Sequence, residues 1–366
     1  MQRPGSSGMP SRRQLLGLAP LAAWPAWAAA RGALQPDERI LFMPGTARRL
    51  DAQRIEADLH AWVYEPERRP GARTAFARYL GIDPAALSAA ERERFRRRCG
   101  LFLTDSERGK EVVVRFAAAP ARLLRLPATD AAGRGSLRAV IEGVPPSGDA
   151  QPLAFEAVLT EGDARRFTGR ALLVPPEGLS VVSDIDDTIK LTHVRDRREM
   201  LLNTFVRRFR AAPGMAAHYR RLAARPGTCL HYLSASPMQL LPALEDFLST
   251  AGFPAGSLHL RESTHWRALV PGEGESKAHK LGAIARLMDD FPDRRFLLVG
   301  DSGEADPEIY AEVMRTRPGR VLAALIRDVT GEDRQAPRYR RAFEGIAPAG
   351  WHLLPPDGSH WPLKNT

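Results

Sequence analysis

The stretch VVSDIDDTIK, residues 181–190, places three aspartates within four residues, directly after a short apolar run. Val181 and Val182 are β-branched, and a run this short and apolar is typical of a buried parallel strand. The carboxylates would therefore lie at the carboxyl end of a strand, where open α/β sheets place their ligands. Carboxylates this close together need a cation or a dense set of hydrogen bonds to stay ionised. The sequence thus favours a divalent metal site at this edge of a sheet.

The second half of the chain repeats this arrangement. Short apolar runs alternate with stretches of helical periodicity, which predicts βαβ units and an α/β fold, a parallel sheet with flanking helices. We place this domain at residues 176–343 and leave the tail, residues 344–366, without interpretation. The strand-like runs are LSVVSD, TCLHYLSAS, SLHLRE, RFLLVGD and VLAALIRD, and the helical runs lie around 198–209, 215–224, 240–251, 280–290 and 307–314.

The preceding segment, residues 31–175, has a different period. Apolar residues alternate with polar ones, as in IEADLHAWV at 55–63, and this predicts a small antiparallel β-sandwich. A helical insertion interrupts it, where Ser88 and Glu91 form a capping box. The sequence VPPEGLS at 174–180 predicts the linker to the second domain. After the capping box comes a basic run, for which a solvated helix face and docking on anionic phosphate both stay open: Arg92, Arg94, Arg96, Arg97 and Arg98.

Residues 1–30 have the composition of an export signal. Arg12 and Arg13 precede an apolar stretch that ends in small residues. This resembles a twin-arginine signal with cleavage after Ala28 or Ala30. The apolar stretch is too short and too interrupted by prolines to be a membrane anchor. We therefore expect an exported, periplasmic protein.

A net charge of +10 favours acidic partners. These include nucleic acid, anionic membrane surfaces and phosphorylated substrates, and charge alone does not choose among them. The chain has two cysteines, Cys99 and Cys229, which are too few for a disulfide framework or a zinc site. The sequence decides neither whether they pair nor what the oligomeric state is.

Four short motifs in the second domain follow strands or open helices: DIDDT, YLSASP, ESKAHK and VGDSGEADPE. An EF-hand calcium loop does not explain the aspartates, because Thr188 and Ile189 stand where that loop needs an oxygen ligand and a glycine. In this order, the motifs resemble the haloacid dehalogenase superfamily of aspartate-nucleophile phosphotransferases over residues 179–329. Within it, the strings GLSVVSDIDDTIK, PGM, HYLSASP, FPDRRFLLVGDSGEADPEIY and ALIRDV are similar to phosphatidate phosphatases of the actin-patch-protein type.

This resemblance implies a Rossmann-like core and a Mg²⁺-dependent phosphatase that forms an aspartyl phosphate. Asp184 would be the nucleophile. Asp186 would protonate the leaving alkoxide and then, as a carboxylate, activate the water that hydrolyses the intermediate. Thr188 would hold Asp186 in position, and Ser234 would donate to a phosphate oxygen.

The resemblance also implies a lysine and a metal site. Lys280, with Lys277 as the alternative, would bridge the nucleophile and the phosphate. Hard oxygen ligands suit Mg²⁺. The ligands would be Asp184, the carbonyl of Asp186, and Asp301, with Asp187, Glu304 and Asp306 around them.

The implied substrate is phosphatidate, hydrolysed to diacylglycerol and phosphate. The segment between Asp187 and Pro213 is too short for a large separate cap domain, which suits a lipid head group at a membrane or a bulky phosphoester. Two alternatives stay open. One is a peripheral protein that binds anionic lipid and keeps a vestigial phosphatase core, and the other is a phosphotransferase acting on another phosphomonoester. We expect no nucleic-acid partner.

Overall fold

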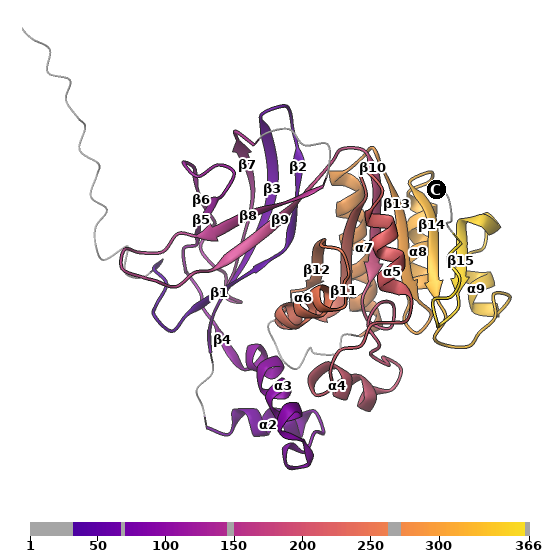
Figure 1. Ribbon diagram of the computed structural model, residues 1–366, viewed down its shortest axis with the longest axis horizontal. Helices are drawn as coiled ribbons and strands as arrows, with labels where there is room; N and C mark the ends of the chain where they lie inside the picture. Colours follow the sequence, from indigo (N-terminus) through magenta and orange to yellow (C-terminus); the bar gives the residue numbers. More distant parts are fainter. Residues whose placement is uncertain (1–31, 67–69, 145–149, 263–271, 363–366) are drawn as a thin grey trace, which may run out of the picture.

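The computed structural model has two sheets, and most of its helices lie around the second one (Figure 1). The predicted export signal, residues 1–30, lies outside the described residues. Across the described ranges, no helix is both long enough and apolar enough to cross a lipid bilayer. The structure describes residues 32–66, 70–144, 150–262 and 272–362.

The first sheet has nine strands. Its strands pair mostly antiparallel, as expected, but they join into one continuous sheet instead of two packed sheets, and β2 and β9 pair in parallel. The long chain segment between these two strands permits that, since parallel neighbours need a long connection. In β3, Ile55, Ala57 and Leu59 alternate with less buried residues and enter one core. The strands are β1 (Arg39–Met43), β2 (Gly45–Arg49), β3 (Arg54–Pro66), β4 (Thr104–Ser106), β5 (Val113–Phe116), β6 (Leu123–Arg125), β7 (Arg134–Glu142), β8 (Gln151–Ala157) and β9 (Thr168–Val174).

The predicted helical insertion lies between β3 and β4. Its capping box is confirmed: the Ser88 hydroxyl accepts from the Glu91 N–H, and the Glu91 carboxylate accepts from the Ser88 N–H. Arg94 and Arg98 donate to backbone carbonyl oxygens near the second sheet, so the arginine run is not simply a solvated face. The helices are α2 (Ala72–Tyr79), η1 (Pro84–Ala86), α3 (Ala89–Gly100) and η2 (Leu101–Leu103).

The second sheet has six parallel strands in the order β12-β11-β10-β13-β14-β15. Val181 of β10 enters the core on one face and Val182 the core on the other, as expected for a parallel strand buried on both sides. The predicted α/β fold is therefore confirmed, and the tail adds β15. The strands are β10 (Gly178–Asp184), β11 (Cys229–Pro237), β12 (Ser257–Arg261), β13 (Arg294–Asp301), β14 (Val321–Arg327) and β15 (Trp351–Leu354).

Helices flank this second sheet (Figure 1). Residues of α4, α5 and α6 join the core on one face, and residues of α7, α8 and α9 join the core on the other. The helices are α4 (Arg197–Phe205), α5 (Met215–Ala223), η3 (Met238–Leu240), α6 (Leu241–Thr250), α7 (Glu273–Asp290), α8 (Asp306–Thr316), α9 (Pro337–Ala342) and η5 (Pro348–Gly350).

Direct contacts join the two sheets. Arg138 of β7 donates paired hydrogen bonds to Asp58 in its own sheet and to Asp290 at the end of α7. The N–H of Leu258 in β12 donates to the carbonyl of Pro44 at 2.9 Å. The first sheet therefore packs beside the β12 edge of the second.

The two cysteines do not pair. Cys99 lies in α3, Cys229 opens β11, and both are buried free thiols. Burial raises the pKa of each thiol to about 11, so both stay protonated near neutral pH. They serve as small apolar core residues.

Candidate active site

The predicted site residues meet at the carboxyl edge of the second sheet. Asp184 ends β10 and Asp301 ends the neighbouring strand β13. Ser234 lies in β11, on the other side of β10. Lys280 comes from α7 and Asp306 opens α8. Parallel strands bring these distant residues to one edge, as the strand-end motifs predict.

Lys280 lies at the centre of a group of carboxylates. Its ammonium lies 2.8 Å from Asp184 Oδ1, 2.6 Å from Asp306 Oδ1 and 2.9 Å from Glu304 Oε2. Burial by itself lowers the pKa of Lys280, but these carboxylates outweigh it and hold the pKa well above its usual value. The alternative lysine, Lys277, pairs instead with Glu312 at 2.7 Å and is 42% exposed.

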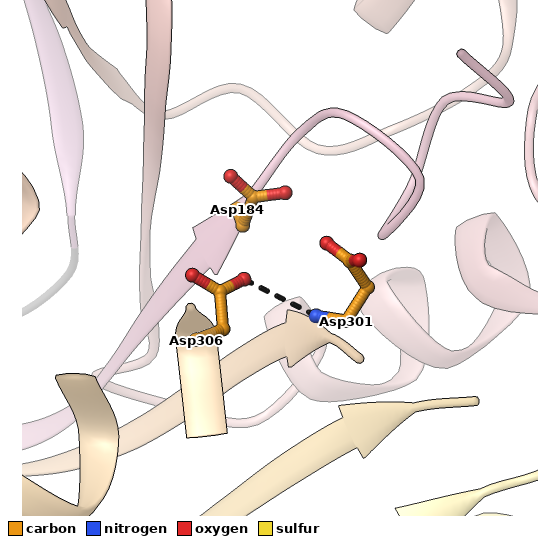
Figure 2. Close-up of side chains that lie close together, drawn as sticks. All are labelled: Asp184, Asp301 and Asp306. Carbon is orange, nitrogen blue, oxygen red and sulfur yellow. Dashed lines mark hydrogen bonds between the residues drawn. The ribbon is translucent and has the colours of Figure 1, made fainter. Parts of the chain in front are cut away.

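Three buried carboxylates form a triad at the same point (Figure 2). Asp184, Asp301 and Asp306 each have an oxygen within 4.8 Å of the others. Burial, and then the neighbouring negative charges, raise the pKa of Asp184 and of Asp301 well above the usual value, although Lys280 acts in the opposite sense. Like charges this close in a buried site favour a bound cation.

The three aspartates differ in how their oxygens are already used. Asp306 accepts from Lys280 at Oδ1 and from the N–H of Asp301 at Oδ2, at 3.2 Å. Asp301 accepts from the N–H of Gly303 at 2.6 Å. Asp184 is 1% exposed, and neither of its oxygens accepts a hydrogen bond from any residue that the structure describes, since its contact with Lys280 is an ion pair without hydrogen-bond geometry. Asp184 is thus the carboxylate left for a metal or a substrate.

Gly300 is what allows Asp306 to reach the strand end. A Cβ at this position would lie 2.3 Å from Asp306 Oδ2, closer than any real contact permits. The glycine of the VGDSG motif therefore lets α8 begin directly against β13. A turn-forming role alone does not account for it.

Asp186 lies in a separate, well-satisfied environment. One oxygen accepts from Lys190 at 2.6 Å and Thr192 at 2.7 Å, and the other accepts from Ser234 and Ser236, both at 2.9 Å. Burial by itself raises the pKa of Asp186, but Lys190 and these donors outweigh it and lower the pKa to about 2. Asp186 is therefore a carboxylate near neutral pH, and Ser234 is engaged with it.

Thr188 and Asp187 make contacts that the sequence analysis did not predict. The Thr188 hydroxyl donates to Asp301 Oδ2 at 3.3 Å and does not hold Asp186, because the loop turns it toward β13. Asp187 takes a positive φ of 57°. Its carboxylate accepts from three backbone N–H groups that follow it in the loop, those of Thr192, His193 and Val194. Asp187 thus shapes the loop.

Sequence reasoning missed three basic residues. Lys190 is 2% exposed and pairs with Asp186, and its position four residues later in the same motif was a usable signal. Arg327 donates to the carbonyl of Asp187 at 2.6 Å. Arg338 donates to the carbonyl oxygens of Ser302 and Glu304 and so fixes the loop after β13. Nothing in the local sequence distinguishes these two arginines from the many on the surface.

A family model described as "Phosphatidate phosphatase APP1, catalytic domain" matches residues 179–328. The chain is 35% identical over 158 residues to phosphatidate phosphatase APP1 of Saccharomyces cerevisiae. The aligned region covers 42% of this chain and 26% of that protein. The chain is also 29% identical over 194 residues to an uncharacterized protein of Schizosaccharomyces pombe, covering 49% of this chain and 31% of that protein.

The chain thus spans about a quarter to a third of the length of these curated relatives. Among solved structures, a Parabacteroides merdae β-glucuronidase aligns with 80% of this chain and 34% of its own at 10% identity. Its TM-score of 0.26 is too low to carry an argument. The resemblance of the α/β domain to phosphatidate phosphatases of the APP1 type, predicted from its motifs, is confirmed for residues 179–328.

Proposed function

We propose that this protein is a Mg²⁺-dependent phosphatase of the haloacid dehalogenase type that hydrolyses a lipid phosphomonoester, phosphatidate. The observation that carries the proposal is Asp184, a buried carboxylate that faces the ammonium of Lys280 and has no hydrogen-bond donor within the described ranges. The match to the APP1 catalytic domain supports the substrate.

Asp184 acts as the nucleophile in this mechanism. Its carboxylate attacks phosphorus, the bond to the leaving alkoxide breaks, and an aspartyl phosphate forms. Lys280 neutralises one phosphate oxygen, while Asp306 and Glu304 orient its ammonium. The donor set fits a hard cation, and Mg²⁺ held by Asp184 and Asp301 would lower the repulsion between carboxylate and phosphate dianion. The Asp186 carbonyl as a further ligand stays a prediction.

Asp186 is suited to the hydrolytic step. As a carboxylate it takes a proton from the water that attacks the aspartyl phosphate. To act as an acid in the first step, Asp186 must first be protonated. The negative charge of a nearby phosphate dianion favours this, because a like charge raises the pKa of a carboxyl group. Lys190 and Ser234 fix its position through both oxygens.

If the phosphatase core were vestigial, some of the residues needed for catalysis would be replaced. Here, in contrast, the buried lysine and carboxylates are all present and pair with one another. A phosphotransferase would use the same residues and differ only in its acceptor. Measuring free phosphate and phosphorylated alcohol from the same reaction separates the two.

We also propose that the chain is exported and that its basic first domain contacts anionic membrane. The signal-like composition of residues 1–30 and the net charge of +10 support this. Amino-terminal sequencing of protein from the producing cell tests export, with a start near Ala29 or Arg31 expected. A chain beginning at Met1 would contradict it.

The deciding experiment is an assay of purified protein on a panel of phosphomonoesters. Activity on phosphatidate with Mg²⁺, lost with EDTA and restored by added Mg²⁺, is the expected result. No turnover of any member of the panel would leave the lipid-binding alternative. Turnover that EDTA does not affect would remove the metal from the mechanism.

A further inference from the structure

A cavity of about 780 Å³ opens beside the candidate active site and reaches Asp186 and Ser234. One side of this cavity is lined by charged residues and another side by apolar residues. Charged side chains, including Lys277 and Arg338, lie on the side of α7 and α9. The apolar lining comes mainly from α4, from the end of β11 and from η3: Met200, Leu201, Phe205, Pro237 and Leu240.

Helix α4 is fixed from outside by the helical insertion of the first domain. Figure 1 shows α2 and α3 next to α4. The ring of Phe205 lies 5.4 Å from that of Phe102 and 5.7 Å from that of Phe76, both in edge-to-face geometry. The cavity wall thus continues into an aromatic cluster that belongs to the insertion.

Arg98 of α3 completes this contact at the carboxyl end of α4. Its guanidinium donates to the carbonyl of Thr204 at 2.9 Å and to that of Arg207 at 2.7 Å. It also lies 3.6 Å from the ring centroid of Phe209. The last carbonyls of a helix have no partner within the helix, and a cation there is favourable. Arg98 therefore caps α4 from the other domain.

From these contacts we infer that α4 is the wall that recognises the acyl chains of the substrate, and that Arg98 is the positioning residue that holds this wall. The inference rests on the proposed function and adds its specificity element. With the phosphate at the strand ends, hydrocarbon attached to the same molecule would lie along Met200 and Leu201, since apolar surface is stabilised by burial against apolar surface. The helical insertion would thus help to form the substrate-binding wall, the role that a separate cap domain would otherwise have.

Two substrates isolate this element: dioctanoyl phosphatidate, used below its aggregation threshold, and glycerol 3-phosphate. They share the phosphomonoester and differ only in the acyl chains. Met200→Gln should lower the ratio of kcat/KM for the acylated over the plain substrate by about tenfold, mainly through KM. The matched control is Leu202→Gln, an apolar and partly buried residue of the same helix that does not line the cavity. It should leave the ratio unchanged.

Arg98→Met keeps an apolar stem but removes the donors. It should lower the same ratio, and Arg98→Lys should restore part of it. The control Arg97→Met changes the preceding residue of α3, which is exposed, and should have no effect. Melting temperatures of all variants show whether a loss follows from unfolding.

An unchanged ratio in Met200→Gln and Arg98→Met, or an equal fall in both controls, would overturn the inference. Wild-type protein that turns over neither substrate would overturn the proposed function alone. In that event the inference is still decided by calorimetric titration, which measures the affinity for both compounds. The two proteins compared are the Asp184→Asn variant and the double variant that also carries Met200→Gln. Equal loss of affinity for the two compounds would reject α4 as the acyl wall.

Discussion

The ammonium of Lys280 lies 2.8 Å from Oδ1 of Asp184, and each side chain is only 1% exposed. An ion pair this deeply buried is costly unless other groups stabilise both charges. Lys280 has two further carboxylates, whereas Asp184 has no hydrogen-bond donor in the part of the chain that the structure describes. The carboxylate of Asp184 therefore stays reactive, and its poorly compensated burial lowers the free energy of unfolding.

Asp184→Asn should abolish turnover and keep the fold. The amide has the shape of the carboxylate but no charge with which to attack phosphorus. It also removes one of three crowded carboxylates, so the melting temperature without metal should not fall. Steady-state kinetics and thermal unfolding check both points. Asp289→Asn, an exposed residue paired with Arg317, is the control and should keep full activity. Retained turnover in Asp184→Asn would disprove the nucleophile.

Asp186→Asn should let aspartyl phosphate accumulate. The amide cannot take a proton from the attacking water, so hydrolysis slows by about 100-fold or more. Acid quenching of the reaction with labelled substrate, followed by counting of label on the protein, measures the intermediate. A variant that is slow but carries no label would show that Asp186 acts only as the acid in the transfer to Asp184 and not in hydrolysis of the intermediate.

Mg²⁺ should stabilise the protein in the absence of substrate. Because the metal relieves repulsion between buried carboxylates, saturating Mg²⁺ at 100 times its Kd should add about 2.7 kcal/mol to the free energy of unfolding. The shift in melting temperature on adding Mg²⁺ measures this. Asp301→Asn should reduce the shift, whereas Asp328→Asn, outside the triad, should not. An equal shift in both variants would place the metal elsewhere.

The strand ends were predictable from sequence because their signal is local. Val181 and Val182 predict a buried strand, and its end fixes where Asp184 lies. Asp306 was expected only near the site, because its contact with the Asp301 N–H depends on how closely α8 meets β13 at Gly300. Lys190 was missed although it stands only four residues after Asp186, because their contact depends on a loop whose turn is set by Asp187. Contacts made through loop geometry leave no periodic signal.

His231 should make the protein sensitive to acid. It is fully buried between Ser257 and Ser180, and burial lowers its pKa well below the usual value. The unfolded chain binds a proton below about pH 6.5 and the folded one does not, so this contribution to stability is present above pH 6.5 and lost as pH falls.

The slope is measurable. His231 should lower the free energy of unfolding by about 1.4 kcal/mol per pH unit between pH 6 and pH 5. Urea titrations at several pH values give the slope, and His231→Gln should reduce it by that amount. His360→Gln, on an exposed side chain, should leave it unchanged. A slope that His231→Gln does not alter would show that other groups cause the acid sensitivity.

Vesicle binding should depend on α3, but not through the whole arginine run. Arg94 and Arg98 are engaged with the end of α4, so reversing their charge would disturb the cavity as well as any membrane contact. Arg92 and Arg97 are exposed. Each basic side chain near an anionic surface adds about 1 kcal/mol of attraction, and salt screens it, with a Debye length of about 3 Å at 1 M.

Arg92→Glu with Arg97→Glu should therefore weaken sedimentation with anionic vesicles as much as high salt does, and leave hydrolysis of glycerol 3-phosphate unchanged. The matched control carries the same change in net charge on α9, at Arg340→Glu and Arg341→Glu, which are also exposed. Equal losses in the two double variants would mean that net charge, and not α3, drives association. Vesicle binding that neither salt nor α3 substitution alters would reject the membrane role and favour soluble phosphomonoesters as substrates.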